Sequence, residues 1–389
     1  MGDETADAMM IRRGNLVEER AYWLAWSQVD RVGPVLLRRL QQHFGTLADA
    51  WKASTTQLQQ VEGFGYQSAS AVTAARSQIN PEQFLEQHSV KNPYFWTPGD
   101  ADYPRLLLEI PSPPPVLYYR GQVQPQENQG ITPMVGIVGT RDPSDYGKRW
   151  TRRISTALVN RGFTVVSGMA AGIDTEAHMG CLETGGRTIA VLGTGVDMVY
   201  PPRNQPLYEK ILAQGLVLSE YPAGTQPNRI HFPQRNRIIA GLSRAVLVME
   251  APTKSGALIT ADYANDFCRD VYALPGSLDN YKSLGCLGLL SRGAHLILNE
   301  GHLLEMLGAI PELDSAVQLP LLAQEQPKPV PQLEPELAKV LQALASEPTS
   351  FDAIVQQSGL AAGSVSSALL QLELMGLVSQ LPGMQYRRC

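Results

Sequence analysis

The segment MVGIVGTRDPSDYGKRWTRRISTALVNRGFTVVSGMAAGID, residues 134–174, decides the fold. It begins with a short apolar run (134–139), continues with a helix-length stretch (145–162), and returns to an apolar run (163–168) that ends in a glycine-rich turn. Runs that are apolar throughout indicate strands covered on both faces, as in parallel sheets. The segment therefore predicts a strand–helix–strand unit of a doubly wound, Rossmann-like sheet.

The same alternation continues to about residue 300. Five further apolar runs are TIAVLG (188–193), GLVLSE (215–220), AVLVMEA (245–251), DVYALPG (270–276) and HLILN (295–299). Helix-length stretches separate them. We predict an α/β fold in which residues 92–310 form an extended Rossmann-like domain around a parallel sheet.

Residues 16–91 carry apolar residues at helical spacing and predict an all-helical domain. Two turns in it, VDRVGPVLLRRL (29–40) and VEGFGYQSASAV (61–72), place a glycine before a helix start, as in helix-hairpin-helix modules that bind phosphate. A plain helical bundle with glycine turns is the alternative, and Pro34 at a helix start is explained by capping alone. We favour the module for the second turn more than for the first.

Residues 311–335 hold six prolines and predict a linker. Residues 336–389 predict three amphipathic helices and two short strands about a Pro-Gly turn, the pattern of a winged helix. Five acidic and three basic residues lie between 331 and 389, and the expected recognition helix (361–376) has no basic residue. We therefore expect a module for protein contact or dimerisation, with Arg387 and Arg388 as its candidate phosphate contacts.

The composition is that of a globular protein with two or three domains. The chain has 389 residues, 44% hydrophobic and 18% charged, with net charge -5, so any site for a polyanion must be local. The four cysteines lie far apart without a C-x-x-C pair, which argues against a zinc site or disulfides. No signal-peptide core or membrane span is evident. We expect a soluble, cytoplasmic protein without membrane contact.

Small and polar residues follow several predicted strands, where ligands bind in open parallel sheets. Ser-Gly opens a helical stretch at Ser167–Gly168 and again at Ser255–Gly256, so backbone N–H groups and the helix dipole predict anion sites there. The first loop is G-x-x-G without a ribose-binding acid, and no Walker A spacing is present. These patterns predict phosphate binding without a nucleotide cofactor.

Two stretches are locally basic. Residues 141–161 hold six basic and two acidic residues, and residues 225–245 hold four arginines and no acidic residue. Each stretch therefore has an excess of four positive charges. Such an excess favours a polymer over a single nucleotide. The stretches contain Arg141, Lys148, Arg149, Arg152, Arg153 and Arg161, then Arg229, Arg235, Arg237 and Arg244. We expect Arg152 and Arg153 to belong to a solvated helix face.

The aromatic and acidic residues of these stretches have two interpretations each. Phe232 is suited equally to stacking on a base and to core packing, whereas core packing is favoured for Trp150. Asp174 and His178 lie one helical turn apart, but a metal would need a third ligand. We expect Asp174 to cap a helix and His178 to be held in a loop network, and we predict no catalytic residue and no metal site.

The loops GIVGTRDPSDYG, VVSGMAAGIDTEAH, HFPQRNRIIAGLS and KSGALITADYA, in this order, closely resemble the DNA-processing protein A family (DprA, also called Smf). The resemblance implies a non-enzymatic mediator of natural transformation and DNA recombination. Such a protein binds incoming single-stranded DNA, protects it and helps load the RecA recombinase, usually as a homodimer through the Rossmann domain. It implies DNA contacts at Gly139, Thr140, Arg141, Ser167, Gly168, Arg235, Asn236, Arg237, Lys254, Ser255 and Gly256, to which we add Phe232 as a stacking candidate.

Three positions depart from the family pattern. Ala171 stands where a basic residue is frequent, Gln234 replaces a frequent arginine, and Leu287 replaces a frequent asparagine. Two other functions stay open. A Rossmann-type nucleotide-processing enzyme resembling the lysine-decarboxylase-like phosphoribohydrolases lacks its P-G-G-x-G-T signature here. A structural adaptor would tolerate charge reversal at Arg235 and Arg237.

Overall fold

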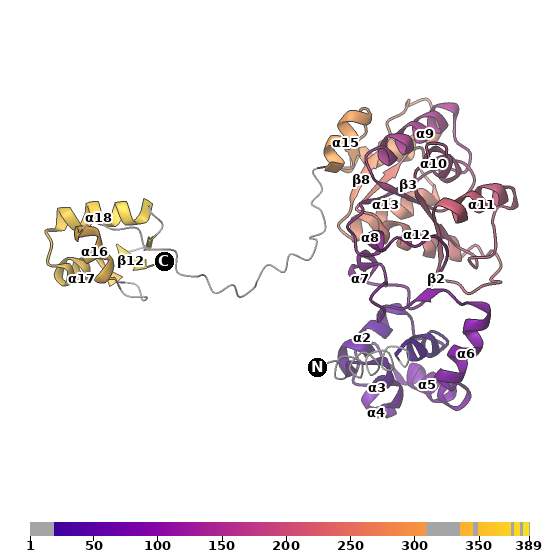
Figure 1. Ribbon diagram of the computed structural model, residues 1–389, viewed down its shortest axis with the longest axis horizontal. Helices are drawn as coiled ribbons and strands as arrows, with labels where there is room; N and C mark the ends of the chain where they lie inside the picture. The colour runs from indigo at the N-terminus through magenta and orange to yellow at the C-terminus, as the bar shows by residue number, and fades with distance from the viewer. Residues whose placement is uncertain (1–18, 309–334, 345–348, 375–376, 382–383, 389) are drawn as a thin grey trace, which may run out of the picture. The chain divides into compact units, whose positions relative to one another are not determined.

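The computed structural model describes residues 19–308, 335–344, 349–374, 377–381 and 384–388 (Figure 1). The chain forms two compact units, Met1–Ser315 and Ala316–Cys389. We describe each unit by itself.

The first unit is built on a nine-stranded sheet with the order β1-β2-β6-β5-β4-β3-β7-β8-β9. Strands β3 to β9 are parallel and confirm the predicted Rossmann-like sheet. The strand order reverses between β3 and β7, which are neighbours in the sheet. The parallel strands are β3 (Met134–Val138), β4 (Thr164–Ser167), β5 (Thr188–Leu192), β6 (Leu216–Ser219), β7 (Ala245–Val248), β8 (Asp270–Ala273) and β9 (His295–Leu296).

One edge of the sheet is antiparallel, so the prediction of a wholly parallel sheet is wrong there. Strand β2 (Leu117–Gly121) pairs antiparallel with β6, and β1 (Phe95–Trp96) pairs antiparallel with β2. Three prolines (113–115) precede β2. Proline lacks an N–H donor but is tolerated immediately before a strand, which is how it is used here. Trp96 stacks on Tyr119 across β1 and β2, with ring centroids 4.0 Å apart.

Helices cover both faces of the sheet (Figure 1). Alternate residues of β3 point to opposite faces: Val138 joins the cluster formed with α12 and α13, and Ile137 joins the cluster formed with α9 and α10. The main helices are α9 (Asp145–Val159), α10 (Ile173–Leu182), α11 (Gln205–Gln214), α12 (His231–Leu242), α13 (Gly256–Asp266), α14 (Leu284–Ser291) and α15 (Glu300–Gly308). Shorter elements are α7 (Arg105–Glu109), α8 (Pro125–Asn128), η1 (Pro202–Asn204) and η2 (Tyr281–Ser283).

The helices before the sheet have a core of their own, centred on Trp26, Leu37, Leu40 and Trp51. Residues 19–26 are helical, and α2 (Pro34–Phe44), α3 (Leu47–Lys52), α4 (Thr55–Leu58), α5 (Tyr66–Gln78) and α6 (Pro81–Lys91) follow. Gly33 and Gly65 are the N-caps of α2 and α5, as the two turns predicted. This region contacts the remainder of the unit through Arg38, whose Nη1 donates to the carbonyl of Ile110 at 3.0 Å.

The second unit is a winged helix, as predicted. Helices α16 (Pro335–Gln342), α17 (Phe351–Ser358) and α18 (Ala362–Leu374) pack around Val340, Ile354 and Val365. The small antiparallel sheet contains β10 (Thr349–Ser350), β11 (Val378–Leu381) and β12 (Gln385–Arg388). The predicted linker, apart from its last residue, lies outside the described residues.

Candidate nucleic-acid interface

A cavity of about 600 Å³ opens at the carboxyl ends of the strands, beside the point where the strand order reverses. Ligands of open α/β sheets bind at such points. Its walls come from the loop after β3, the loop after β4, the start of α12 and the segment that leads into α13. We call it the main cavity. A smaller cavity of about 100 Å³ shares Arg141, Phe232 and Arg235 with it.

The main cavity brings together most of the residues singled out from the sequence. Nine of the twelve line it: Gly139, Thr140, Arg141, Phe232, Arg235, Asn236, Lys254, Ser255 and Gly256. Gly168 lines the smaller cavity. Segments up to 117 residues apart in sequence therefore meet at one place, from Gly139 to Gly256.

Arg235 is the central cation of the site. It projects from α12 into both cavities and is only 4% exposed. Within the described part of the chain, its Nε and Nη1 have no hydrogen-bond partner. Burial lowers the pKa of Arg235 to about 10, the effect of Asp174 opposes the shift, and Arg141 adds to it. The guanidinium is thus charged at neutral pH, and a buried, unpaired charge of this kind favours an anionic ligand.

Gly168 makes room for Arg235. A Cβ atom at position 168 would lie 1.6 Å from Nη1 of Arg235, far inside any van der Waals contact. The guanidinium therefore lies directly against the backbone after β4. The sequence predicted this glycine as a phosphate contact, and the structure gives it a second role, the positioning of Arg235.

Asp174 is the acidic residue that lines the main cavity. Its Oδ2 accepts a hydrogen bond from the backbone N–H of Ala170 at 3.3 Å, so it stabilises the loop before α10. The N-cap of α10 is Gly172, and the predicted role of Asp174 as the helix cap is wrong. Burial raises the pKa of Asp174, and the charge of Arg235 opposes this.

His178 lies in the core, and its predicted place in a loop network is also wrong. It is fully buried on α10, and its Nδ1 is 2.7 Å from Oγ1 of Thr188 on β5. Burial lowers the pKa of His178 to about 3, and Arg235 adds to the shift. The imidazole is therefore neutral at ordinary pH and contributes packing and one hydrogen bond.

Two predicted contacts do not face either cavity. The hydroxyl of Ser167 is buried and donates to the carbonyl of Ile137 at 2.6 Å. Arg237 forms a buried ion pair with Glu220, with Nη2 and Oε2 2.6 Å apart. Residues 235 and 237 point to different sides of α12 because successive helical residues are about 100° apart. Neither side chain is available to a ligand in the cavity.

Tyr200 and Arg229 also line the main cavity. Tyr200 is 41% exposed, and its ring centroid is 5.5 Å from that of Phe232. Phe232 is half-buried, and the guanidinium carbon of Arg141 lies 5.6 Å from its ring centroid. Sequence reasoning counted Arg229 in the basic stretch without placing it in the site. It missed Tyr200, whose only signal is a Tyr-Pro pair after the strand-end loop VLGTGVD.

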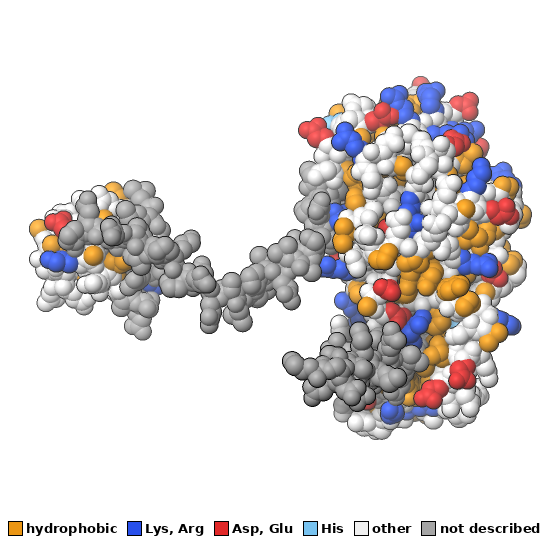
Figure 2. All heavy atoms as spheres, viewed as in Figure 1, with side chains coloured by type: hydrophobic (Ala, Val, Ile, Leu, Met, Phe, Trp, Pro, Cys, Tyr) orange, Lys and Arg blue, Asp and Glu red, His pale blue; other side chains and the backbone are white. Residues whose placement is uncertain are grey.

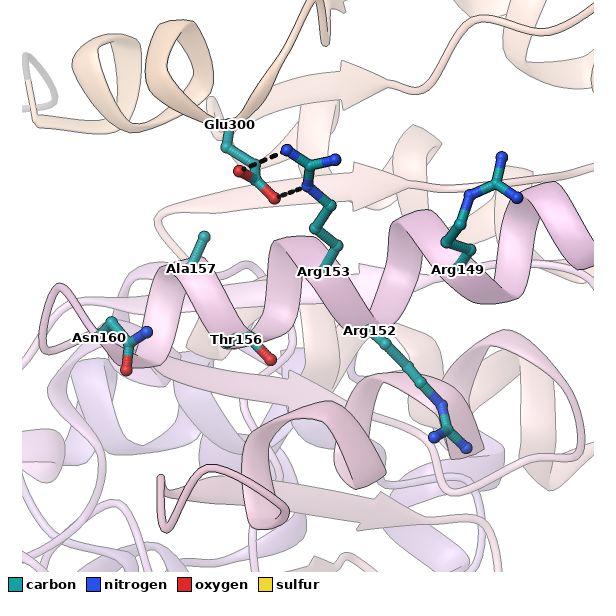
Figure 3. Close-up of a pocket in the computed structure, with 7 residues that line it drawn as sticks. All are labelled: Arg149, Arg152, Arg153, Thr156, Ala157, Asn160 and Glu300. Atoms are coloured by element: carbon teal, nitrogen blue, oxygen red, sulfur yellow. Dashed lines mark hydrogen bonds and ion pairs between the residues drawn. The ribbon is translucent and has the colours of Figure 1, made fainter.

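The helical part of the basic stretch 141–161 forms a different surface on α9, around an open cavity of about 460 Å³ (Figure 3). Arg153 is turned toward Glu300 and pairs with it, and Arg152 points to another side of the helix, where it pairs with Glu176 and Glu183. Figure 2 shows basic and acidic side chains next to each other over this end of the unit. We call this surface the α9 face. The face is therefore largely neutralised by its own carboxylates.

Trp150, also on α9, packs against the core cluster on that side of the sheet, as predicted. Across the described ranges, no group of three or more His, Cys, Asp or Glu residues is placed to hold a metal ion. Nor, in those same ranges, is any helix both long and apolar enough to cross a bilayer.

Comparison with known proteins gives matches over most of the chain. The family model described as DNA recombination-mediator protein A matches residues 94–308, and the DprA winged helix domain matches residues 324–384. Protein Smf of Synechocystis sp. is 58% identical over 393 residues, which cover 95% of this chain and 99% of that protein.

Solved structures agree with these matches. DNA processing protein A from Streptococcus pneumoniae is similar with a TM-score of 0.65 at 35% identity, over 73% of this chain and 97% of that chain. DNA processing protein A from Helicobacter pylori, whose structure is described as giving insight into a single-stranded DNA binding mode, is similar with a TM-score of 0.50 at 31% identity, over 56% of this chain and 97% of that chain. With its sheet, its winged helix and these relatives taken together, the chain belongs to the DNA recombination-mediator protein A (DprA/Smf) family.

Proposed function

We propose that the main cavity binds the phosphate backbone of single-stranded DNA. One observation carries the proposal: the buried, charged Arg235 has no hydrogen-bond partner for Nε or Nη1 among the described residues, and it faces a cavity that Arg141, Arg229 and Lys254 also line. Asp174 is the one acid in that lining, so the wall has a net charge of three positive charges from four cations and one anion. Clustered cations bind phosphates with strong salt dependence.

Backbone groups add to this site. Ser255 is the N-cap of α13, and its Oγ accepts from the N–H of Ala257 at 3.2 Å. Gly256 opens the helix, with nothing within 4 Å of the position that a Cβ would take. The positive end of the α13 dipole and its open first turn are suited to a phosphate oxygen. Asn236 fixes the turn by donating to the carbonyl of Gly256 at 3.1 Å.

The aromatic residues favour a single strand over a duplex. Phe232 and Tyr200 lie beside the cations and expose ring surface to the cavity. A base can stack on such a ring only when it is not paired within a helix. The single-stranded binding mode named for the Helicobacter pylori relative supports the same ligand class.

The wider role is proposed from family membership. The protein would act without catalysis, protecting incoming DNA and loading RecA in natural transformation, as a cytoplasmic homodimer through its Rossmann domain. The proposed domains are a helical domain (16–91), the Rossmann-like domain (92–310), a linker (311–335) and the winged helix (336–389). The RecA step is tested by the rate of RecA filament formation on oligo-dT with and without the protein; an unchanged rate contradicts it.

DNA binding is tested by fluorescence anisotropy with labelled oligo-dT and a duplex of equal length, at several salt concentrations. Wild type should prefer the single strand and lose affinity as salt rises. Arg141→Gln and Lys254→Gln should weaken binding, whereas Arg149→Gln, which removes an exposed cation from the α9 face, should not. Equal losses in all three variants, or no preference for the single strand, would remove the main cavity from the proposal.

A further inference from the structure

Glu250 occupies a position where Rossmann domains usually bind a ligand phosphate. It follows β7 closely, and β7 adjoins β3 at the point where the strand order reverses. At such a point the N-terminus of the helix after the first strand commonly receives a phosphate. That helix here is α9, whose N-cap is Ser144.

The side chain of Glu250 takes up the donors at this helix start. Its Oε2 accepts from the backbone N–H of Ser144 at 2.7 Å, and its Oε1 accepts from Oγ of Ser144 at 2.7 Å and from Nδ2 of Asn280 at 3.0 Å. Ser144 Oγ in turn accepts from the N–H of Gly147 at 3.2 Å. The first turn of α9 therefore has an anion supplied by the chain itself.

The fit is close and buried. Glu250 is 2% exposed, and a Cβ at Gly147 would lie 2.5 Å from its Oε2. Among the residues that the structure describes, no lysine or arginine forms an ion pair with Glu250; Lys282 pairs with Asp142 at 2.7 Å instead. The carboxylate is held by neutral donors and the helix dipole, as a bound phosphate is.

The backbone of Glu250 contacts a residue of the cavity wall. Its carbonyl accepts from the N–H of Thr140 at 2.7 Å, and Thr140 and Arg141 line the cavity. Of the two helix starts at α9 and α13, the one at α9 is filled by Glu250, whereas Ser255 and Gly256 at the start of α13 line the cavity.

We propose that Glu250 is a specificity-determining residue whose carboxylate replaces a nucleotide phosphate at the N-terminus of α9. The protein therefore rejects free nucleoside phosphates there and leaves Arg235, Lys254 and the start of α13 to a phosphodiester chain. This inference rests on the proposed binding of single-stranded DNA.

The test compares wild type, Glu250→Ala and Glu250→Gln by isothermal titration with dTMP. The alanine variant opens the anion site and should bind dTMP at least about tenfold more tightly than wild type, because freed N–H donors at a helix start bind phosphate. The glutamine variant fills the same space and should stay near the wild-type affinity. Equal dTMP affinity in all three proteins overturns the proposal.

A folding defect in Glu250→Ala leaves the proposal testable. Inorganic phosphate, but not chloride at the same ionic strength, should then restore the folded circular dichroism spectrum, and failure to restore it overturns the proposal. Oligo-dT anisotropy is measured on the same samples. A wild type that does not bind oligo-dT contradicts the proposed function, whereas the dTMP comparison still reports on Glu250.

Discussion

Arg235 of the main cavity and Arg152 and Arg153 of the α9 face come from two stretches with the same excess of positive charge, and the structure treats these arginines in opposite ways. Residues 141–161 and 225–245 each have four more basic than acidic residues. On α9, Arg152 and Arg153 pair with Glu176, Glu183 and Glu300. In the cavity, Arg235 forms no ion pair with any carboxylate that the structure describes. Local charge along a sequence indicates a polyanion site only where tertiary structure leaves that charge unpaired.

The largest effect should come from Arg235→Gln. Glutamine keeps a polar side chain but removes the buried charge, so oligo-dT affinity should fall about 100-fold, roughly 3 kcal/mol. The free energy of unfolding should not fall, because the variant no longer has to bury a charge that lacks a partner, and burying such a charge is costly. Anisotropy and urea unfolding check both. If the variant binds oligo-dT as tightly as wild type, Arg235 does not contact the DNA, and the prediction is wrong.

The sequence predicted which residues lie near the site better than it predicted where their side chains point. The helix-opening Ser-Gly turn was enough to place Gly256 at a ligand-binding strand end, and the family resemblance added Gly139 and Lys254. They did not separate Arg235 from Arg237, because that requires the rotational phase of α12 and the position of Glu220 on another segment. The same limit applies to Ser167, whose hydroxyl turns into the sheet toward Ile137.

The fold was predicted in more detail than the site. Apolar runs identified β3 to β8 because nearly all residues of these strands are buried, and the run HLILN also identified β9, whose two residues are exposed. Strands β1 and β2 were missed because they lie at an antiparallel edge, where pairing partners rather than local hydrophobicity define a strand. Tyr200 was missed for a related reason, since only the folded chain brings it to Phe232.

A somewhat smaller loss should follow from Gly168→Ala. The added methyl would overlap Nη1 of Arg235 and displace the guanidinium from the cavity, so oligo-dT affinity should fall about tenfold or more. Gly288→Ala on α14 is the matched control, because nothing lies within 4 Å of its Cβ position. Anisotropy that changes equally in both variants would contradict a positioning role for Gly168.

Asp174→Asn should strengthen binding by about threefold at neutral pH, because it removes the acidic residue from the cavity wall. Burial raises the pKa of Asp174 in the folded protein above its ordinary value of 3.8. The stability that Asp174 contributes is therefore fully present at a pH below 3.8, and it is lost as the pH rises through the raised pKa of the folded protein. Urea unfolding at several pH values should show this loss in wild type and not in the variant.

The smallest effect should come from Arg153→Gln on the α9 face. Its charge is exposed and already paired with Glu300, so solvent and the carboxylate both screen it from DNA. Oligo-dT affinity should stay within about twofold of wild type, and its salt dependence should keep the same slope. A loss near that of Arg235→Gln would mean that DNA displaces Glu300 and runs along α9. The two basic surfaces would then differ in how easily DNA displaces the carboxylates that pair with their arginines. The presence of an ion pair alone would not tell a DNA-binding surface from one that does not bind DNA.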